Sequence, residues 1–439
     1  MINFFITIIC NGTIRAWRKY KYMKWVQLAL LLLCFFEPII PIIAFLLLGV
    51  YEWFADIPYR ASVRRWNQIF ADIGMGGKDT PNYLFDKEIS KYAKQIVFKT
   101  LIPPNVWESK KEALEMHINK KILSIIQDED NNRIIRLIIA GEPLTSDIAW
   151  SEDYFDYGTD FLNIGISYFG FVGMDLTKHP HAFVAGETGS GKSNILKCMI
   201  HQSLNKYYDV VLIDFKRGVA FSGFSDYIDM HFDYKSAIEA LKGVIVDTNR
   251  RLDLFRESRV DSFEDYNEHS GEKLRRKILF IDEVAELLKT RDKEISNILY
   301  DSLETITRLS RATGIHLIMG IQRPDSTIIS GQIKNNVPFR VCGRFVDPEP
   351  SRIMLNNESA IKLPNIKGRF LIKDDVMHEV QCFYYSNSSL AGLWVMPRSK
   401  INAPTMNEEK AKPSPIKQET APRKSEVLSD DLNFDFSDK

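Results

Sequence analysis

The chain has 439 residues, enough for one core domain of ordinary size and a smaller module. It carries 57 basic and 57 acidic side chains, and this balance excludes a global attraction to nucleic acid. Any contact with DNA must come from a local patch or from a pore shared by several subunits. The five cysteines and eight histidines show no zinc-ligand spacing, which argues against a zinc site and suits a reducing cytoplasm.

An apolar run near the N-terminus predicts a membrane anchor. Residues 25–56 are almost wholly apolar, follow a basic segment (residues 1–24) and are too long for a signal peptide. Basic residues on both flanks favour a helical hairpin that turns near Glu37-Pro38, with both ends cytoplasmic. Each arm is shorter than the roughly 20 residues of a full span, so a single tilted span kinked at Pro38 is the alternative. Both arrangements hold the protein at the cell membrane, and we expect the later domains in the cytoplasm.

Residues 57–157 are expected to form a small membrane-proximal α+β adaptor domain. Lys94–Ile102 and Arg133–Ala140 have the composition of strands, and Trp107–Gln127 has apolar residues at the spacing of an amphipathic helix. Gly141–Tyr157 is rich in acidic residues and turn formers, which predicts a linker to the next domain. We find no recognisable chemistry in this part of the sequence.

A phosphate-binding motif follows the short apolar strand predicted at His181–Ala185. It reads Gly186-Glu187-Thr188-Gly189-Ser190-Gly191-Lys192-Ser193, which has the spacing of a P-loop. Its glycines let backbone N–H groups turn inward around phosphate oxygens. Lys192 is expected to reach the β- and γ-phosphates, and Ser193 to offer its hydroxyl to Mg²⁺. Apolar residues at helical spacing come next, so a helix N-terminus would point at the anion. The motif predicts binding of ATP with Mg²⁺.

Residues 158–385 alternate apolar strands with helices, as expected for an ATPase domain. The predicted helices are Tyr234–Glu257 and Lys293–Arg311. Besides the strand before the P-loop, the predicted strands are Val210–Asp214, Ile278–Ile281, His316–Ile321, Phe339–Phe345 and Arg369–Lys373. This alternation predicts an α/β fold with a parallel sheet covered on both faces and ligands at the carboxyl ends of its strands.

Two of these strand ends carry polar residues with predicted catalytic roles. Asp282 is expected to hold Mg²⁺ through its water shell, and Glu283 to polarise the attacking water. Gln322, at the end of another strand, is suited to sensing the γ-phosphate. An acidic pair at a helix start is common by itself, but the P-loop upstream favours the catalytic interpretation.

Several linked motifs resemble the FtsK/SpoIIIE family of DNA-translocating ATPases. They occur in order at Asp175–Gly186, Phe280–Glu283, Arg311–His316, Ile321–Pro324 and Ile333–Arg340. The resemblance covers residues 160–375, roughly half of the chain. It implies a RecA-like P-loop NTPase core that assembles into a ring, usually a hexamer, and pumps double-stranded DNA through its pore.

Within that family, the short N-terminal anchor and single ATPase domain are most similar to the coupling proteins of Gram-positive conjugative elements. Their Arg-Ala-Ala-Gly box corresponds to Arg311-Ala312-Thr313-Gly314, with Thr for the second Ala. This resemblance implies a coupling protein of conjugative transfer, with a relaxase or channel proteins as partners. The alternatives are a chromosome or prophage DNA translocase, a type VII-like protein secretion ATPase, and a scaffold that uses ATP only to assemble.

Several basic residues are candidates for contacts with DNA or with a neighbouring subunit, among them Lys216 and Arg217, which follow the predicted strand Val210–Asp214. Arg323 and Lys334 flank the loop that faces the pore in related rings, which makes them candidate DNA contacts. For an arginine finger that completes a neighbour's site, Arg311 ranks first, Arg344 second and Arg340 third.

The last part of the chain, residues 386–439, is predicted to be disordered because it is rich in Pro, Lys, Glu and Ser. Its final segment, Asp430–Asp438, combines acidic and aromatic residues. The tail is either a solubilising segment or a peptide that docks into a basic pocket of a partner.

Overall fold

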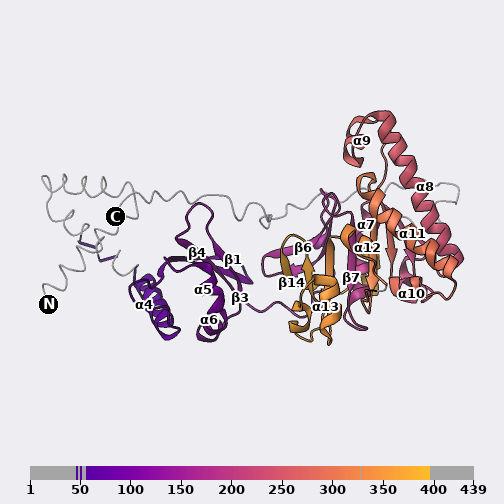
Figure 1. Cartoon of the computed structure of the whole chain (residues 1–439). Helices are drawn as coiled ribbons and strands as arrows, with labels where there is room; N and C mark the ends of the chain where they lie inside the picture. Colours follow the sequence, from indigo (N-terminus) through magenta and orange to yellow (C-terminus); the bar gives the residue numbers. More distant parts are fainter. Residues whose placement is uncertain (1–45, 48–49, 52–55, 327, 396–439) are drawn as a thin grey trace, which may run out of the picture. The chain divides into compact units, whose positions relative to one another are not determined.

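The computed structural model describes residues 46–47, 50–51, 56–326 and 328–395. The chain divides into two compact units, Met1–Gly141 and Glu142–Lys439, each of which is described by itself (Figure 1). The predicted basic N-terminus, most of the predicted membrane region and residues 396–439 of the predicted tail lie outside the described residues. In the described ranges, no helix combines the length and apolar character that crossing a membrane requires.

Within residues 56–141, the first unit is an antiparallel sheet with three helices. The strand order is β1-β2-β4-β3. The elements are α4 (Ile57–Asp72), β1 (Asn82–Ser90), β2 (Ala93–Lys99), α5 (Pro104–Ser109), α6 (Lys111–Ile118), β3 (Ile122–Gln127) and β4 (Ile134–Ala140). Its core is aromatic, since the fully buried rings of Phe70, Phe98 and Trp107 contact one another with centroids 5.3–5.4 Å apart. The α+β character and the strands β2 and β4 agree with the sequence analysis.

The helix predicted over Trp107–Gln127 is wrong in its second half. The helix ends at Ile118 because Asn119 takes the left-handed conformation with φ 52°. The apolar residues that follow pair with β4 as the strand β3. Isoleucine predominates in this stretch, and its branched Cβ favours a strand. The apolar spacing fits a helix and a strand equally well over so few residues, so only the partner strand decides.

The second unit is built on a mixed sheet of ten strands, in the order β6-β5-β14-β13-β12-β7-β11-β10-β8-β9. The strands are β5 (Phe161–Ser167), β6 (Gly170–Asp175), β7 (His181–Ala185), β8 (Asp209–Ile213), β9 (Asp229–His231), β10 (Lys277–Ile281), β11 (Ile315–Ile321), β12 (Phe339–Gly343), β13 (Arg369–Lys373) and β14 (Met377–Cys382). The six strands from β12 to β9 are parallel, and the other four run antiparallel.

This sheet confirms the α/β P-loop NTPase fold, and the predicted strand positions of the ATPase domain are confirmed closely. The expectation of a wholly parallel sheet is wrong, however. Only Tyr168 and Phe169 connect β5 to β6, and residues 374–376 connect β13 to β14. Such short connections close hairpins, because a parallel pair needs a crossover of a dozen or more residues.

Alternate residues of the parallel strands contact different helices, so the sheet has a core on each face. Ile278 and Phe280 of β10 lie in one core with α7 (Lys192–Asn205). Leu279 and Ile281 lie in the other core, with α8 (Tyr234–Ser258), α10 (Val284–Leu288), α11 (Lys293–Leu309), α12 (Gly331–Asn336) and α13 (Pro348–Leu355). Figure 1 shows α8 along the outside of this unit, with α9 (Phe263–His269) near its end.

The segments predicted as linker and as the start of the tail belong to this unit. Trp150 is buried, and its backbone N–H donates to the carbonyl of Tyr384 at 2.8 Å. After β14, the 3₁₀ helix η5 (Asn387–Gly392) and Trp394 are bound by the side chain of Asn205 on α7. The linker prediction is therefore wrong for residues 142–157, and the predicted disorder is wrong for residues 386–395. Aromatic side chains within these polar segments supply apolar surface that α7 buries.

Candidate nucleotide-binding site

The P-loop lies at the carboxyl end of β7 and at the start of α7. Gly191, the residue before the first helical turn, has φ 112°, a conformation that only glycine adopts without strain. The loop is tied to two neighbouring strands. The N–H of Gly186 donates to the carbonyl of Ile321 on β11 at 3.0 Å, and the N–H of Gly368 before β13 donates to the carbonyl of Ser190 at 2.8 Å. The second contact joins residues far apart in sequence, and the motif does not predict it.

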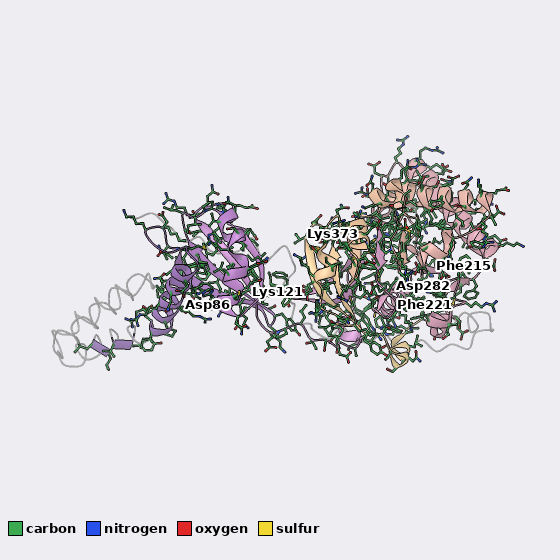
Figure 2. The ribbon with its side chains drawn as sticks, turned by 60° about the horizontal axis from the view of Figure 1, so that its bottom comes forward. Asp86, Lys121, Phe215, Phe221, Asp282 and Lys373 are labelled. Carbon is green, nitrogen blue, oxygen red and sulfur yellow. The ribbon has the colours of Figure 1, made fainter. Side chains whose placement is uncertain are left out.

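Lys192 points across the sheet to Asp282, which directly follows β10 at its carboxyl end. Asp282 is labelled in Figure 2. Its Nζ is 3.1 Å from Oδ1 of Asp282 and 3.7 Å from Oε2 of Glu283, and it also donates to the backbone carbonyl of Asp282. Only 4% of Lys192 is exposed. A buried ammonium between two carboxylates is a strong local charge that incoming phosphate groups can recruit.

The intervening strand β11 leaves room for this contact because it has a glycine there. A Cβ at Gly320 would lie 2.1 Å from the carbonyl oxygen of Asp282 and 2.9 Å from Nζ of Lys192. Any side chain at this position would therefore displace the P-loop lysine or the end of β10. Gly320 could not be recognised from the sequence, because the crowding exists only between three strands that are distant in sequence.

Ser193 and Asp282 fit a magnesium ion that is held together with nucleotide phosphates. The hydroxyl oxygen of Ser193 is 3.5 Å from Oδ1 of Asp282, so a hydroxyl and a carboxylate face the same space. Mg²⁺ prefers oxygen ligands and usually combines one or two protein groups with phosphates and water. In the described part of the chain, no group of three or more His, Cys, Asp or Glu side chains could hold a metal ion by itself. The donor set suits Mg²⁺ bound with ATP.

Glu283 has the geometry of a general base. Its Oε1 accepts the backbone N–H of Gln322 at 3.1 Å, while its Oε2 is buried and accepts no hydrogen bond. Burial raises the pKa of the Glu283 carboxyl, against the opposing effects of the Lys192 charge and the Gln322 N–H. A buried carboxylate with one unused oxygen can take a proton from a water molecule bound next to it.

Gln322 connects this carboxylate to the P-loop. Its side-chain oxygen accepts a hydrogen bond from the Thr188 hydroxyl at 3.1 Å. On the other side of the loop, the Glu187 carboxylate accepts the N–H of Val346 at 3.2 Å. The structure thus brings together the predicted residues Lys192, Ser193, Asp282, Glu283 and Gln322 around one loop.

The structure reveals two further residues at this edge that the sequence analysis did not assign to the nucleotide site. Asp214, at the end of β8, is buried, and its carboxylate accepts the N–H groups of Lys216 at 2.9 Å and Gly218 at 3.0 Å. Lys216 in turn places its Nζ 3.4 Å from Oδ2 of Asp282. The available signal was topological, since β8 and β10 are neighbours whose carboxyl ends meet.

The candidate finger residues are widely separated. Arg311 is exposed on the 3₁₀ helix η3 (Ser310–Thr313), before β11, at the amino ends of the parallel strands. A strand of the length of β11 spans roughly 20 Å, so Arg311 cannot reach the P-loop of its own chain. Arg344 follows β12 and is half-buried at the carboxyl ends, beside the P-loop.

Arg340 is not available as a finger. It is buried in β12, and its guanidinium donates to the backbone carbonyls of Val337, Lys334 and Met354. Three hydrogen bonds to carbonyls hold it in the interior, and its removal would leave those acceptors unsatisfied. The third-ranked candidate is therefore a structural residue.

The Arg-Ala-Thr-Gly box forms a corner of the fold. Arg251 of α8 donates to the carbonyl of Thr313 at 2.9 Å, and Gly314, with φ 68°, packs directly against the ring of Phe263 on α9. Within this box, only Arg311 projects into solvent. The other box residues with these contacts position η3 against α8 and α9.

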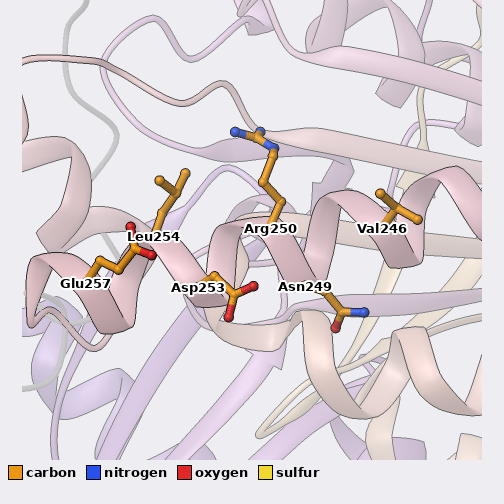
Figure 3. Close-up of a pocket in the computed structure, with 6 residues that line it drawn as sticks. All are labelled: Val246, Asn249, Arg250, Asp253, Leu254 and Glu257. Carbon is orange, nitrogen blue, oxygen red and sulfur yellow. The ribbon is translucent and has the colours of Figure 1, made fainter.

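The two candidate DNA contacts do not lie together. Arg323 is exposed just after β11, at the carboxyl ends of the strands. Lys334 is half-buried on α12 near the start of β12, where burial and the charges of Arg340 and Lys373 lower its pKa. Both belong to the connection from β11 to β12, Arg323 at its start and Lys334 near its end. A pocket on the outer face of α8 is separate from the nucleotide site. Its lining residues, from Val246 to Glu257, all belong to α8 and include no residue of the P-loop or of the acidic strand end (Figure 3).

Comparison with known proteins identifies the family. The family model described as FtsK/SpoIIIE family matches residues 170–326. The curated "DNA translocase FtsK" of Campylobacter jejuni is 32% identical over 43% of this chain, and that of Helicobacter pylori is 36% identical over 43%. The chain spans only 21% and 23% of the length of these two relatives.

A solved structure covers more of the chain. The conjugation coupling protein TcpA of pCW3, in its monomer form with ATPγS, is 35% identical, with a TM-score of 0.56. The match covers 74% of this chain and 96% of the chain in that solved structure. The P-loop, the acidic strand end and these matches together show that the chain belongs to the FtsK/SpoIIIE family and is an ATPase.

Proposed function

We propose that this chain is a membrane-anchored motor that uses ATP to translocate DNA and serves as the coupling protein of a conjugative transfer system. The observation that carries the proposal is the match to TcpA, which extends over 96% of the solved chain of that protein. A match to 74% of this chain is longer than the whole second unit, Glu142–Lys439, so it includes part of the first unit. The FtsK relatives match only 43% of the chain, and their name supports DNA as the substrate.

The site geometry supports a hydrolysis mechanism with one role for each residue. Lys192 leaves the carboxylates and neutralises charge on the β- and γ-phosphates. Ser193 and Asp282 would hold Mg²⁺, which would supply further positive charge to the phosphates. Glu283 receives the proton of the attacking water on its unused Oε2. Gln322 links the position of this base to the P-loop through Thr188.

A ring of subunits, usually a hexamer in this family, completes the proposed motor. In the described part of the chain, no arginine forms an ion pair or hydrogen bond with Lys192, Asp282 or Glu283. Charge on the transferred phosphoryl group would then be neutralised by a neighbour, and the exposed Arg311 supports this arrangement. We propose that residues 25–56 anchor the ring at the cell membrane, and that the ATPase domain is cytoplasmic because basic residues flank the anchor.

Two measurements test the proposal. The ATPase activity of the full-length protein in detergent is expected to rise with DNA, to fall steeply with salt and to depend little on DNA sequence. Glu283→Gln serves as the inactive control. An activity that no DNA stimulates would overturn the motor hypothesis.

A transfer assay separates coupling from the alternative of chromosome or prophage translocation. In conjugating donor cells, the wild-type gene is replaced by its Glu283→Gln variant. We expect DNA transfer to be abolished, and the variant protein to co-purify with a relaxase or channel protein. Normal transfer in the Glu283→Gln cells, together with DNA-stimulated ATPase activity of the wild-type protein, would favour the intracellular translocase instead. Docking through the C-terminal tail predicts that removal of residues 430–439 weakens the co-purification without loss of ATPase activity.

A further inference from the structure

Three buried carboxylates lie at the ends of the neighbouring strands β8 and β10. Asp214 and Asp282 are each 2% exposed and Glu283 is 8% exposed. Burial, with a further contribution from the charge of Asp282, raises the pKa of Asp214. Two lysines lie against this cluster, Lys192 and Lys216, on opposite oxygens of Asp282. The arrangement concentrates negative charge in a site that must also receive phosphates.

Nucleotide binding should change the contacts of Lys192 and leave those of Lys216 in place. Lys192 belongs to the P-loop, so phosphates draw its ammonium away from Oδ1 of Asp282. Oδ1 is also the oxygen that faces the hydroxyl of Ser193, where Mg²⁺ fits. Lys216 lies 3.4 Å from the other oxygen, Oδ2, and stays as a counter-charge of the carboxylate. Without it, Asp282 would be buried beside Glu283 and Asp214 with no lysine of its own.

The backbone fixes the loop that carries Lys216. The Asp214 carboxylate accepts the N–H groups of Lys216 and Gly218, and Arg217 and Gly218 take positive φ values of 61° and 71°. This turn returns the chain over the end of β8 and directs Lys216 toward β10. Although 43% of the Lys216 side chain is exposed, its starting point is rigid. An ordinary surface lysine has no such buried anchor.

We infer that Lys216 is a positioning residue of the nucleotide site, which holds Oδ2 of Asp282 so that Oδ1 faces Ser193 and Mg²⁺ after Lys192 has moved to the phosphates. This inference rests on the proposed ATP–Mg²⁺ site. It assigns Lys216 to the metal half of that site, whereas Lys192 belongs to the phosphate half. Loss of Lys216 should therefore affect binding that depends on Mg²⁺ and spare binding that does not.

The test compares Lys216→Gln with Arg217→Gln, its exposed neighbour on the same turn. Affinity for a fluorescent ATPγS analogue is measured by titration with Mg²⁺ and with EDTA, and the Mg²⁺ concentration for half-maximal tight binding is recorded. Lys216→Gln is expected to raise that concentration by roughly 10-fold, since outer-shell partners typically contribute about 10–100-fold to metal affinity. Binding in EDTA should match the wild type. Arg217→Gln should resemble the wild type in both conditions, and Lys216→Arg should recover much of the loss.

A double-mutant cycle gives an independent readout. In an Asp282→Asn background, Lys216→Gln should have no further effect on Mg²⁺ dependence, because the carboxylate that it positions is gone. Equal loss of affinity with and without Mg²⁺, or no loss in either, would overturn the inference. Lys192→Ala separates this result from failure of the site itself, since it should abolish tight binding under both conditions. Circular dichroism verifies that each variant is folded.

Discussion

At the scale of single residues, the nucleotide site is a balance between buried charges. Lys192 contacts both Asp282 and Glu283, and Oε2 of Glu283 is buried and accepts no hydrogen bond. The same burial that makes Glu283 a stronger base also makes its charge costly in the absence of nucleotide. The residues therefore contribute differently to binding and to turnover.

Substitution of Glu283 should separate binding from hydrolysis. Glu283→Gln keeps the hydrogen bond to the N–H of Gln322 but cannot accept a proton from water. We expect ATP affinity near that of the wild type and a turnover lower by about 10²–10⁴-fold. Lys192→Ala should instead lose tight binding, because the phosphates lose their counter-charge.

The matched control for this pair is Glu286→Gln. Glu286 is an exposed carboxylate on α10, the helix that begins just after Glu283. Its substitution should leave the turnover unchanged. Full turnover by purified Glu283→Gln would remove Glu283 from the role of base.

The pH dependence of activity should report the raised pKa of Glu283. As the pH falls, a carboxyl with a raised pKa takes up its proton above the ordinary value of 4.5, so the base is lost early. The acid limb of the ATPase profile should therefore lie above the usual range of glutamate. Protonation of this group favours the folded state, so its contribution to stability increases as activity falls. An acid limb at or below the ordinary value would contradict the proposed role.

At the scale of elements, the strand β11 decides whether the P-loop and β10 can meet. It lies between β7 and β10, and its only glycine stands where Lys192 passes to Asp282. The rest of β11 is apolar except for His316, as expected for a strand buried on both faces. Glycine, which weakens a strand, thus stands at the position of β11 where a side chain would block the contact between Lys192 and Asp282.

Gly320→Ala should damage nucleotide binding more than its size suggests. The added methyl group would meet the backbone of Asp282, which cannot move aside as a flexible side chain would. We expect a loss of about 1–3 kcal/mol in the free energy of unfolding and a large loss of ATP affinity. Thermal unfolding and nucleotide titration measure the two effects.

Gly243→Ala is the control for this substitution. Gly243 lies in α8, and nothing is within 4 Å of its Cβ position. Alanine should stabilise this helix by about 0.5–1 kcal/mol without a change in ATP affinity. If Gly320→Ala also binds ATP normally, the passage through β11 is not needed for the contact.

At the scale of the whole molecule, one chain does not supply everything that the proposed reaction needs. Arg311, the leading finger candidate, lies at the opposite end of the sheet from its own P-loop. The proposed ring would bring it to a neighbouring subunit. The structural alternative is that Arg311 contributes only a charge at the end of η3, worth about 0.3–1 kcal/mol.

Mixing of two inactive variants tests the contribution across subunits. Arg311→Ala and Lys192→Ala should each lack ATPase activity, since an arginine finger contributes about 10³–10⁵-fold to the rate. Co-assembled rings should regain activity, because some interfaces pair an intact P-loop with an intact Arg311. Verified mixed rings with no recovery, together with recovery by Arg344→Ala mixtures, would transfer the role to Arg344.

The local parts of this protein could be predicted from the amino-acid sequence. The P-loop, the acidic end of β10 and Gln322 are recognisable because their chemistry depends on a few consecutive residues after an apolar strand. The parallel strands were predictable for the same reason, since buried strands are short apolar runs. The FtsK/SpoIIIE motifs depend on short segments in a fixed order, and the comparisons confirm the family that they indicate.

Features that depend on contacts between distant segments could not be predicted in this way. The last part of the helix predicted over Trp107–Gln127 is a strand, because β4 pairs with it. Arg340 is a structural residue, because its guanidinium donates to three carbonyls. The contacts of Gly320 and Lys216 with Asp282 exist only because β8, β10 and β11 end side by side. A motif specifies the conformation of its own residues, whereas close approach and charge pairing depend on which strands are neighbours in the sheet.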